Sequence, residues 1–295
     1  MNAPVLDRAA LAAHARDSIA LGSKSFALAS KLFDPVTRER AWLLYSWCRA
    51  CDDIADGQDH GGTLHPVDNP EERLAYLRDM TEQALAGKAT GVPAFDALAL
   101  VVAECGIPHQ WPRDLIQGFA MDAAGFSPRN EADLLTYCYH VAGVVGLMMA
   151  CLMGVRADDT DTLGRANDLG LAFQLANIAR DLSEDADAGR CYIPMDWLAE
   201  ADIAPGEHMK THSRPAMAKI AQRMAHMAAG YEASARIGAR RLPFRCRWAV
   251  LAAAGIYGDI AREVARRGAS AWDHRVVTSK AAKAGWVARA LLQAL

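Results

Sequence analysis

Two short segments of the sequence end in closely spaced carboxylates, which are the residues best suited to do chemistry. The first, YSWCRACDDIADG, runs from Tyr45 to Gly57, and the second, NIARDLSEDADAG, runs from Asn177 to Gly189. Each reads as the last turns of an apolar helix. Aspartate is a poor helix former there, and negative charge at a helix C-terminus opposes the macrodipole. The recurrence of this unfavourable arrangement suggests a cation-binding role.

At about 100° per residue, each segment places a polar stripe along one side of its helix. The stripes consist of Tyr45, Arg49, Asp52 and Asp56 in the first helix and of Gln174, Asn177, Asp181 and Asp185 in the second. The ordinary interpretation is a pair of solvated faces. Apolar neighbours such as Leu43, Trp47 and Phe173 argue against it, because they indicate helices that are buried on much of their surface.

Two facing stripes of this kind would repel each other unless cations lay between them. Like charges about 4 Å apart repel by about 1 kcal/mol in water and by about 4 kcal/mol at an effective dielectric constant of about 20. Ligand sets made only of oxygen suit Mg2+, which takes one or two carboxylates and shares the phosphates of a substrate. The sequence therefore predicts that Mg2+ and a diphosphate bind between the two helix ends.

The elements that must position these stripes are predicted to be helices throughout. The chain has 295 residues, 52% hydrophobic and 23% charged, and few alternating β-branched runs. Neither an internal repeat nor a low-complexity linker divides it, so we expect one all-α domain over residues 1–295. The net charge of −3 argues against nucleic-acid binding.

Local signals set several helix boundaries. Asp34-Pro35 should open the helix that ends at Gly57, and Asn69-Pro70-Glu71-Glu72 should start another with a cap, an N1 proline and an N3 glutamate. Residues 58–68, 86–93 and 204–215 are expected to be loops or turns. A long helix should follow residues 127–130, and the apolar run at 141–155 within it is short for a membrane span and typical of a buried helix.

Several longer strings extend the pattern well beyond the aspartates and resemble the squalene/phytoene synthase family of head-to-head prenyl synthases. They are GSKSF (22–26), YSWCRACDDIAD (45–56), YCYHVAGVVGLMM (137–149), LAFQLANIARDLSEDADAGRCYIP (171–194) and IYGDI (256–260). Their order and spacing match the family over residues 18 to about 280, most closely its bacterial members. Gly57 departs from relatives, which often carry another acid there. The resemblance implies a class I isoprenoid-synthase-like helical bundle with a central cavity.

The resemblance also implies roles for individual residues. Asp52, Asp56, Asp181 and Asp185 would hold Mg2+, or alternatively Mn2+, and Asn177 would assist diphosphate or metal binding. The residues expected at the diphosphates or the prenyl chains are Ser23, Lys24, Ser25, Phe26, Tyr45, Arg49, Tyr137, Gln174, Arg180, Arg190, Tyr257 and Arg275. Arg180 and Arg275 could equally be surface arginines, and from spacing alone Ser23 would be a helix-start serine.

The same resemblance implies a dry apolar tunnel for the substrate. Water destroys an allylic carbocation, so its surroundings must be closed and apolar. Ala142, Gly143 and Gly146 would leave room for the prenyl chains, and Phe173 could stabilise a cation through its ring face. Without the resemblance to the family, the apolar run at 141–155 would be interpreted as ordinary core packing.

The implied activity is prenyl transfer. Two geranylgeranyl diphosphates would condense through prephytoene diphosphate to phytoene, in carotenoid biosynthesis, with no nicotinamide cofactor. The alternative is coupling of two farnesyl diphosphates to dehydrosqualene or squalene. We expect a cytoplasmic protein that associates loosely with the inner face of the membrane, with other carotenoid enzymes as candidate partners. The sequence shows no signal peptide, and its seven cysteines fit a reducing compartment.

Three other interpretations are less consistent with the residues. Trp47-Cys48 to Cys51 imitates a thioredoxin-type motif, but that motif must open a helix after a strand. A zinc site would need a second cysteine pair at suitable spacing. A non-catalytic helical scaffold would not require two intact Asp-x-x-x-Asp pairs.

Overall fold

The protein is helical throughout the part that the structure describes. A computed structural model covers residues 7–57 and 69–295, and no strand occurs in these residues, which confirms the all-α prediction. The chain forms two compact units: unit 1 is residues 1–123 with 147–163, and unit 2 is residues 124–146 with 164–295. The single domain expected over residues 1–295 stays a prediction. The loop predicted at 58–68 and the side chains of Lys24 and Ser25 lie outside the described residues.

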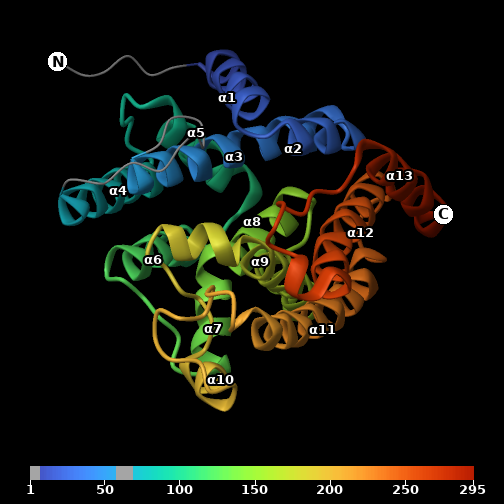
Figure 1. Cartoon of the computed structure of the whole chain (residues 1–295). Coiled ribbons are helices and arrows are strands. Elements are labelled where there is room, and N and C mark those ends of the chain that lie inside the picture. Colours follow the sequence, from blue (N-terminus) through green and yellow to red (C-terminus); the bar gives the residue numbers. More distant parts are fainter. Residues whose placement is uncertain (1–6, 58–68) are drawn as a thin grey trace. The chain divides into compact units, whose positions relative to one another are not determined.

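Unit 1 holds the first acidic segment. Its helices are α1 (Arg8–Gly22), α2 (Lys24–Ala29), the 3-10 turn η1 (Ser30–Leu32), α3 (Pro35–Asp56), α4 (Pro70–Leu85), α5 (Pro93–Cys105) and α6 (Gln110–Ala123). The central element is α3, which packs against α1, α4, α5 and α6 (Figure 1). Leu43, Leu44 and Trp47 are fully buried along it. This burial, worth roughly 1.5–3 kcal/mol for each large apolar side chain, fixes which face of α3 remains for the acidic stripe.

The ends of α3 agree with the sequence prediction. The Asp34 carboxylate accepts hydrogen bonds from the backbone N–H groups of Val36 and Thr37 at 3.0 and 3.1 Å, and Pro35 occupies the first helical position. Gly57 ends the helix in the left-handed conformation, with φ of 63°. This backbone geometry favours glycine because it has no Cβ.

The start of α4 agrees only in part. The helix begins at Pro70, and Glu71 and Glu72 lie in its first turn, as predicted. Asn69 occupies the N-cap position, as predicted, but it has φ of 56° and its side chain makes no capping hydrogen bond. A side chain can cap the N–H groups of the first turn only when its backbone is extended, whereas Asn69 is left-handed.

Unit 2 holds the second acidic segment. Its elements are α7 (Glu131–Cys138), the π-helical segment η2 (Tyr139–Gly143), α10 (Met195–Glu200), α11 (Arg214–Ala239), α12 (Phe244–Arg267), the 3-10 turn η3 (Gly268–Ser270) and α13 (Lys280–Ala294). Two further helices, α8 (Val144–Leu152) and α9 (Thr160–Asp187), have residues in both units. Helices α11, α12 and α13 pack side by side in chain order (Figure 1, orange to red).

The apolar run predicted to form a buried helix lies in the continuous helix Glu131–Leu152, which comprises α7, η2 and α8. Asn130 caps its start by accepting a hydrogen bond from the Asp133 backbone N–H at 3.0 Å. Among the described residues, this is the one helix long and apolar enough to cross a membrane. Half of its most apolar window is buried inside the structure, as in a core helix.

Small residues let this helix approach α9 closely within unit 2. A Cβ at Gly146 would lie less than 3.0 Å from the carbonyl oxygen of Ala166, and one at Gly170 would lie less than 3.0 Å from that of Ala142. The space that Gly143 and Gly146 leave is thus filled by α9. The sequence analysis had instead expected these glycines to leave room for a prenyl chain. Any contact of Ala142 or Gly146 with substrate stays a prediction.

The close packing predicts the effect of adding a methyl group. Gly146→Ala should lower the free energy of unfolding by about 1–3 kcal/mol, because overpacking forces backbone shifts. The matched control is Gly164→Ala in α9, where an added Cβ meets nothing within 4 Å. That variant should be as stable as the parent or gain about 0.5–1 kcal/mol. Urea unfolding of both variants measures this, and equal stability would contradict the packing argument.

Candidate active site

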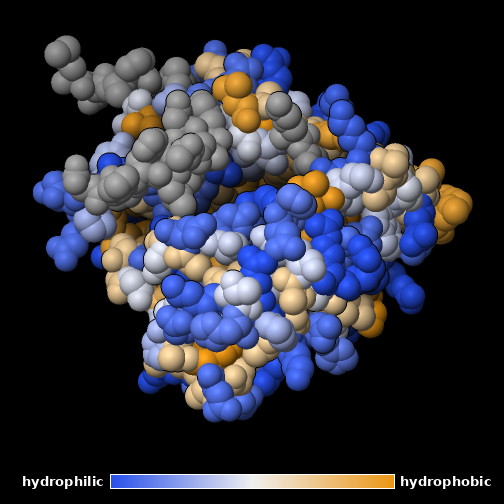
Figure 2. All heavy atoms as spheres, in the orientation of Figure 1, coloured by the Kyte–Doolittle hydropathy of each residue, from blue (hydrophilic) through white to orange (hydrophobic). Residues whose placement is uncertain are grey.

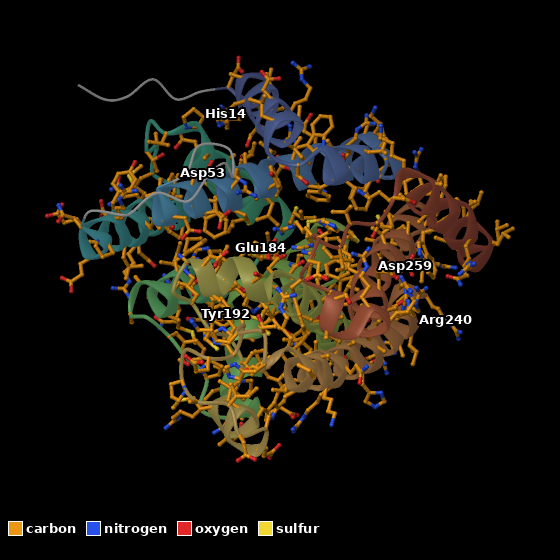
Figure 3. All side chains as sticks on the ribbon, viewed as in Figure 1. His14, Asp53, Glu184, Tyr192, Arg240 and Asp259 are labelled. Carbon is orange, nitrogen blue, oxygen red and sulfur yellow. The ribbon has the colours of Figure 1, made fainter. Side chains whose placement is uncertain are left out.

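The first acidic stripe lies on the half-buried face of α3. Arg49 Nη1 donates a hydrogen bond to Asp52 Oδ2 at 2.6 Å and lies 3.6 Å from Asp53 Oδ1. Asp53 is labelled on α3 in Figure 3. The Asp52 side chain remains 38% exposed. The Arg49 guanidinium thus contacts Asp52 and lies near Asp53, and Asp56 acts electrostatically on Asp52.

The excess negative charge changes the titration of Asp52. Burial raises the pKa of its carboxyl to about 6, Arg49 acts in the opposite direction, and Asp56, Asp53 and Asp122 raise it further. Asp122 lies in the last turn of α6 and was missed by the sequence reasoning. An acid in a last helical turn, shortly before Gly125, is the same signal that identified Asp52. Asp122 could therefore have been identified from the sequence.

Two aromatic residues and a glycine pack next to Arg49. The Tyr45 hydroxyl lies over Gly22, where a Cβ would come within 2.5 Å of it and within 3.5 Å of Arg49 Nε. The Phe26 ring tilts against Tyr45, with 5.7 Å between centroids. Burial raises the pKa of the Tyr45 hydroxyl, while Arg49 opposes this shift. The structure thus brings Tyr45 and Phe26 together with the stripe.

Ser23 has a structural role in the described conformation. Its hydroxyl oxygen accepts a hydrogen bond from the Phe26 backbone N–H at 3.3 Å and so caps α2. This is the helix-start serine that spacing alone suggested. The predicted contact with a diphosphate stays a prediction for Ser23, as it does for Lys24 and Ser25, whose side chains are not described.

The second acidic stripe lies at the end of α9 and carries more positive charge. Arg180 donates to both carboxylate oxygens of Asp181, at 2.6 and 2.5 Å. Arg275 donates to Asp181 Oδ2 at 3.0 Å and to Glu184 Oε1 at 3.1 Å. Glu184 is labelled in Figure 3. The Arg180 side chain is only 16% exposed, so it is not the surface arginine that the sequence left as an alternative.

The remaining polar residues of this stripe are half-buried. Gln174 and Asn177 are partly exposed between buried neighbours, as a stripe on a packed helix requires. The Asp185 carbonyl accepts a hydrogen bond from the Arg190 backbone N–H at 2.7 Å, and Gly189 follows with φ of 72°. Trp272 also donates its ring N–H to the Ala179 carbonyl at 3.0 Å, which ties this end of α9 to the segment after η3.

Stacked aromatic pairs position the predicted tyrosines. Tyr257 on α12 stacks on Phe173 of α9, with 4.1 Å between ring centroids and 21° between planes. Tyr137 stacks on Tyr192 at 4.7 Å and on Phe126 at 5.4 Å. Tyr192 is labelled in Figure 3. Tyr257 and Tyr137 therefore have fixed ring orientations.

A small cavity in unit 2 lies next to the Phe173 ring. It is lined by side chains of α9, α11 and α12, among them Phe173, Glu232 and Arg262, with alanines forming most of the rest. Glu232 is buried and accepts hydrogen bonds from Arg236 at 2.6 Å and from Arg262 at 3.0 Å. Sequence reasoning missed this acid, because its partner Arg262 is thirty residues away and no local motif joins them.

The residues present fit Mg2+ by their chemistry. Asp52, Asp56, Asp181, Asp185 and Asn177 offer only oxygen as hard ligand atoms. Within residues 7–57 and 69–295, no group of three or more His, Cys, Asp or Glu side chains could hold a metal ion by itself. Mg2+ keeps several waters and binds through one or two carboxylates together with phosphates. Its site is thus expected to need the diphosphate.

The two stripes belong to different units. Asp52 and Asp56 lie in unit 1, whereas Asp181 and Asp185 lie in unit 2. On each helix, the polar residues of the stripe lie along one partly exposed side, as predicted. Their joint binding of cations and a diphosphate stays a prediction.

Comparisons with known proteins identify the relatives of this chain. Residues 19–282 match the family model described as squalene/phytoene synthase. A phytoene synthase from Pseudescherichia vulneris is 46% identical over 95% of this chain and 89% of its own length. A 15-cis-phytoene synthase from Pantoea ananas is 45% identical over 96% and 91%, respectively. Among solved structures, a dehydrosqualene synthase shares 26% identity with a TM-score of 0.84, covering 96% of both chains.

The Asp52 environment predicts a measurable titration. In the metal-free protein, the Asp52 carboxyl should titrate with a midpoint near pH 6, because burial and three acidic neighbours disfavour its charged form. It is therefore protonated below that pH, and cation binding at the end of α3 should weaken as the pH falls from 7 to 5. Carboxyl carbon NMR, assigned with Asp52→Asn, measures the midpoint. Asp34 is an internal control, since its hydrogen bonds lower its pKa; equal midpoints would contradict the prediction.

Proposed function

We propose a function from one premise: this chain belongs to the squalene/phytoene synthase family. It is a prenyl-transferring enzyme with the all-α isoprenoid-synthase fold. Phytoene synthases that are 44–46% identical over 91–96% of the chain support phytoene synthase as its activity. The proposed reaction couples two geranylgeranyl diphosphates head to head, through prephytoene diphosphate, to phytoene.

The observation that carries the site assignment is the form of the two stripes. Each places an Asp-x-x-x-Asp pair on a partly exposed face at the end of a packed helix, with arginine in contact. We assign Asp52, Asp56, Asp181, Asp185 and Asn177 as the residues that would hold Mg2+. When bound, Mg2+ stabilises the negative charge that develops on a leaving diphosphate.

The arginines are assigned to the diphosphate groups. Arg180 and Arg275 donate to the Asp181 carboxylate in the described conformation. Phosphate oxygens compete for guanidinium donors because both anions accept paired, charge-assisted hydrogen bonds. We propose that the arrival of a diphosphate draws these donors from Asp181, which frees the carboxylate for the cation. Arg49 would act in the same way at Asp52, and Arg190 would add a further phosphate contact.

The apolar residues are assigned to the prenyl chains and to the exclusion of water. Loss of diphosphate leaves an allylic cation that water would capture, so the surrounding side chains must be apolar. The stacked rings of Tyr257 and Phe173 offer π faces, which attract a nearby positive charge. Two diphosphates and two protons leave over the whole reaction, so no reductant is required.

We propose a location for the enzyme from the chemistry of its substrates. Geranylgeranyl diphosphate carries a long hydrocarbon chain, and phytoene is a hydrocarbon throughout. A cytoplasmic enzyme that releases such a product is expected to associate peripherally with the inner face of the membrane. Enzymes that consume phytoene are the expected partners there.

The product assay tests this function directly. Purified protein incubated with Mg2+ and geranylgeranyl diphosphate, without a reductant, should yield a forty-carbon hydrocarbon identified by mass. Farnesyl diphosphate should be tested as the alternative substrate, because a dehydrosqualene synthase of known structure has the same fold. A thirty-carbon product formed in preference would replace phytoene synthase with dehydrosqualene synthase.

Substitution of single carboxylates tests the cation assignment. Asp52→Asn and Asp185→Asn should each lower turnover by on the order of 100- to 1,000-fold, since each removes a negative ligand for the Mg2+ that stabilises the leaving diphosphate. The matched control is Asp187→Asn, an exposed residue at the same end of α9, which should stay within about twofold of the parent. Circular dichroism should show unchanged helicity. Parent-like turnover of Asp52→Asn or Asp185→Asn would refute the assignment.

A further inference from the structure

Four large apolar side chains are exposed at one end of the α11–α12–α13 layer in unit 2. Ile237 lies in the last turn of α11, Phe244 begins α12, Leu292 lies in the last turn of α13 and Leu295 follows it. Their exposed fractions are 51%, 42%, 74% and 86%, respectively. Figure 2 shows hydrophobic atoms at the end of α13. Single exposed apolar residues are common on protein surfaces, but several gathered at one place mark an interaction site.

These residues lie on elements that are in direct contact. Arg236 at the end of α11 donates to Gln293 Oε1 of α13 at 3.0 Å. Arg247 in α12 donates to the carbonyl of Ala294 at 3.0 Å and to that of Leu242 at 3.3 Å. The end of α13 is thereby held beside the turn between α11 and α12. The segments that carry the exposed apolar side chains therefore lie close together.

The same surface is strongly basic. Exposed arginines lie among the apolar residues at positions 240, 241 and 245, and Arg240 is labelled in Figure 3. Segment 236–247 holds five Arg residues and no Asp or Glu, whereas the whole chain has a net charge of −3. We call this surface the basic tip and define it by Ile237, Arg240, Arg241, Phe244, Arg245, Leu292 and Leu295.

We propose that the basic tip docks on the surface of an anionic lipid bilayer. Basic residues near such a surface are attracted by the headgroup charge, and apolar side chains between them enter the boundary with the acyl chains. Long arginine side chains suit this place because their stems lie along apolar surface while their charged ends reach the headgroups. This docking depends on the charge and exposure of the tip and is the same whichever prenyl diphosphate the enzyme uses.

The other occupants of such a surface fit less well. A second copy of the chain would bring two cationic tips together, and like charges repel. A nucleic acid would pair with the arginines, but its phosphate backbone offers little to exposed Leu292, Leu295 and Ile237. An anionic bilayer satisfies both the charge and the apolar side chains.

Vesicle binding tests the proposal with the full protein and without substrate. The protein should sediment with vesicles made of equal parts phosphatidylcholine and phosphatidylglycerol, and much less with pure phosphatidylcholine. High salt should weaken the binding, because it screens the attraction of exposed charges. Equal binding to both kinds of vesicle would overturn the electrostatic part of the proposal, and binding to neither would overturn all of it.

Two double variants separate the charged from the apolar contribution. Arg240→Glu with Arg245→Glu should weaken binding to the anionic vesicles by on the order of tenfold or more. Ile237→Ser with Leu292→Ser should weaken it by about tenfold, since two apolar side chains no longer leave water. The matched control for charge is Lys219→Glu, exposed near the other end of α11, and the control for apolar exposure is Leu28→Ser in α2. Both controls should bind as the parent does.

Two further measurements distinguish lipid docking from loss of activity and from self-association. Turnover with detergent-dispersed substrate should be unchanged in both tip variants, so that loss of vesicle binding is distinguished from loss of the proposed activity. The parent should also remain monodisperse, with an unaltered mass, when vesicles are absent. If the tip variants changed the oligomeric state, or if the controls lost vesicle binding equally, the tip would not be a lipid-docking surface.

Discussion

The partial burial of like-charged carboxylates at two helix C-termini is the constraint on which the site depends. Negative charge is unfavourable there on two grounds, because it opposes the helix macrodipole and because burial removes it from water. Nearby cations offset part of this cost. At the end of α3, Arg49 pairs with Asp52 and lies 3.6 Å from Asp53, yet the pKa of Asp52 stays raised to about 6. At the end of α9, two guanidinium groups hold Asp181.

The rest of each unit keeps these carboxylates in place. Buried leucines and Trp47 lock the rotation of α3, so that its polar stripe stays on the partly exposed face. In unit 2, small residues bring η2 and α8 close to α9, and Trp272 fixes the end of α9 by a buried hydrogen bond. Ordinary packing energies thus maintain an arrangement that electrostatics alone would not favour.

Sequence reasoning recovered the features whose causes are local. The bounds of α3 follow from Asp34, Pro35 and Gly57, and the stripes follow from helical periodicity. It failed where the cause is a contact between distant residues, as for Glu232 and Arg262, whereas Asp122 carried a local signal that was overlooked. At Gly146 the sequence did not reveal the packing against α9, since a small residue in an apolar run can serve either a ligand or a neighbouring helix, and its contact with substrate stays a prediction. How the two acidic stripes lie relative to each other is likewise not encoded in local sequence signals.

Family resemblance and local physics answer different questions about this chain. A dehydrosqualene synthase shares the fold at a TM-score of 0.84 with 26% identity, so the fold alone does not determine the product. The support for phytoene as the product therefore comes from relatives at 44–46% identity over most of the chain.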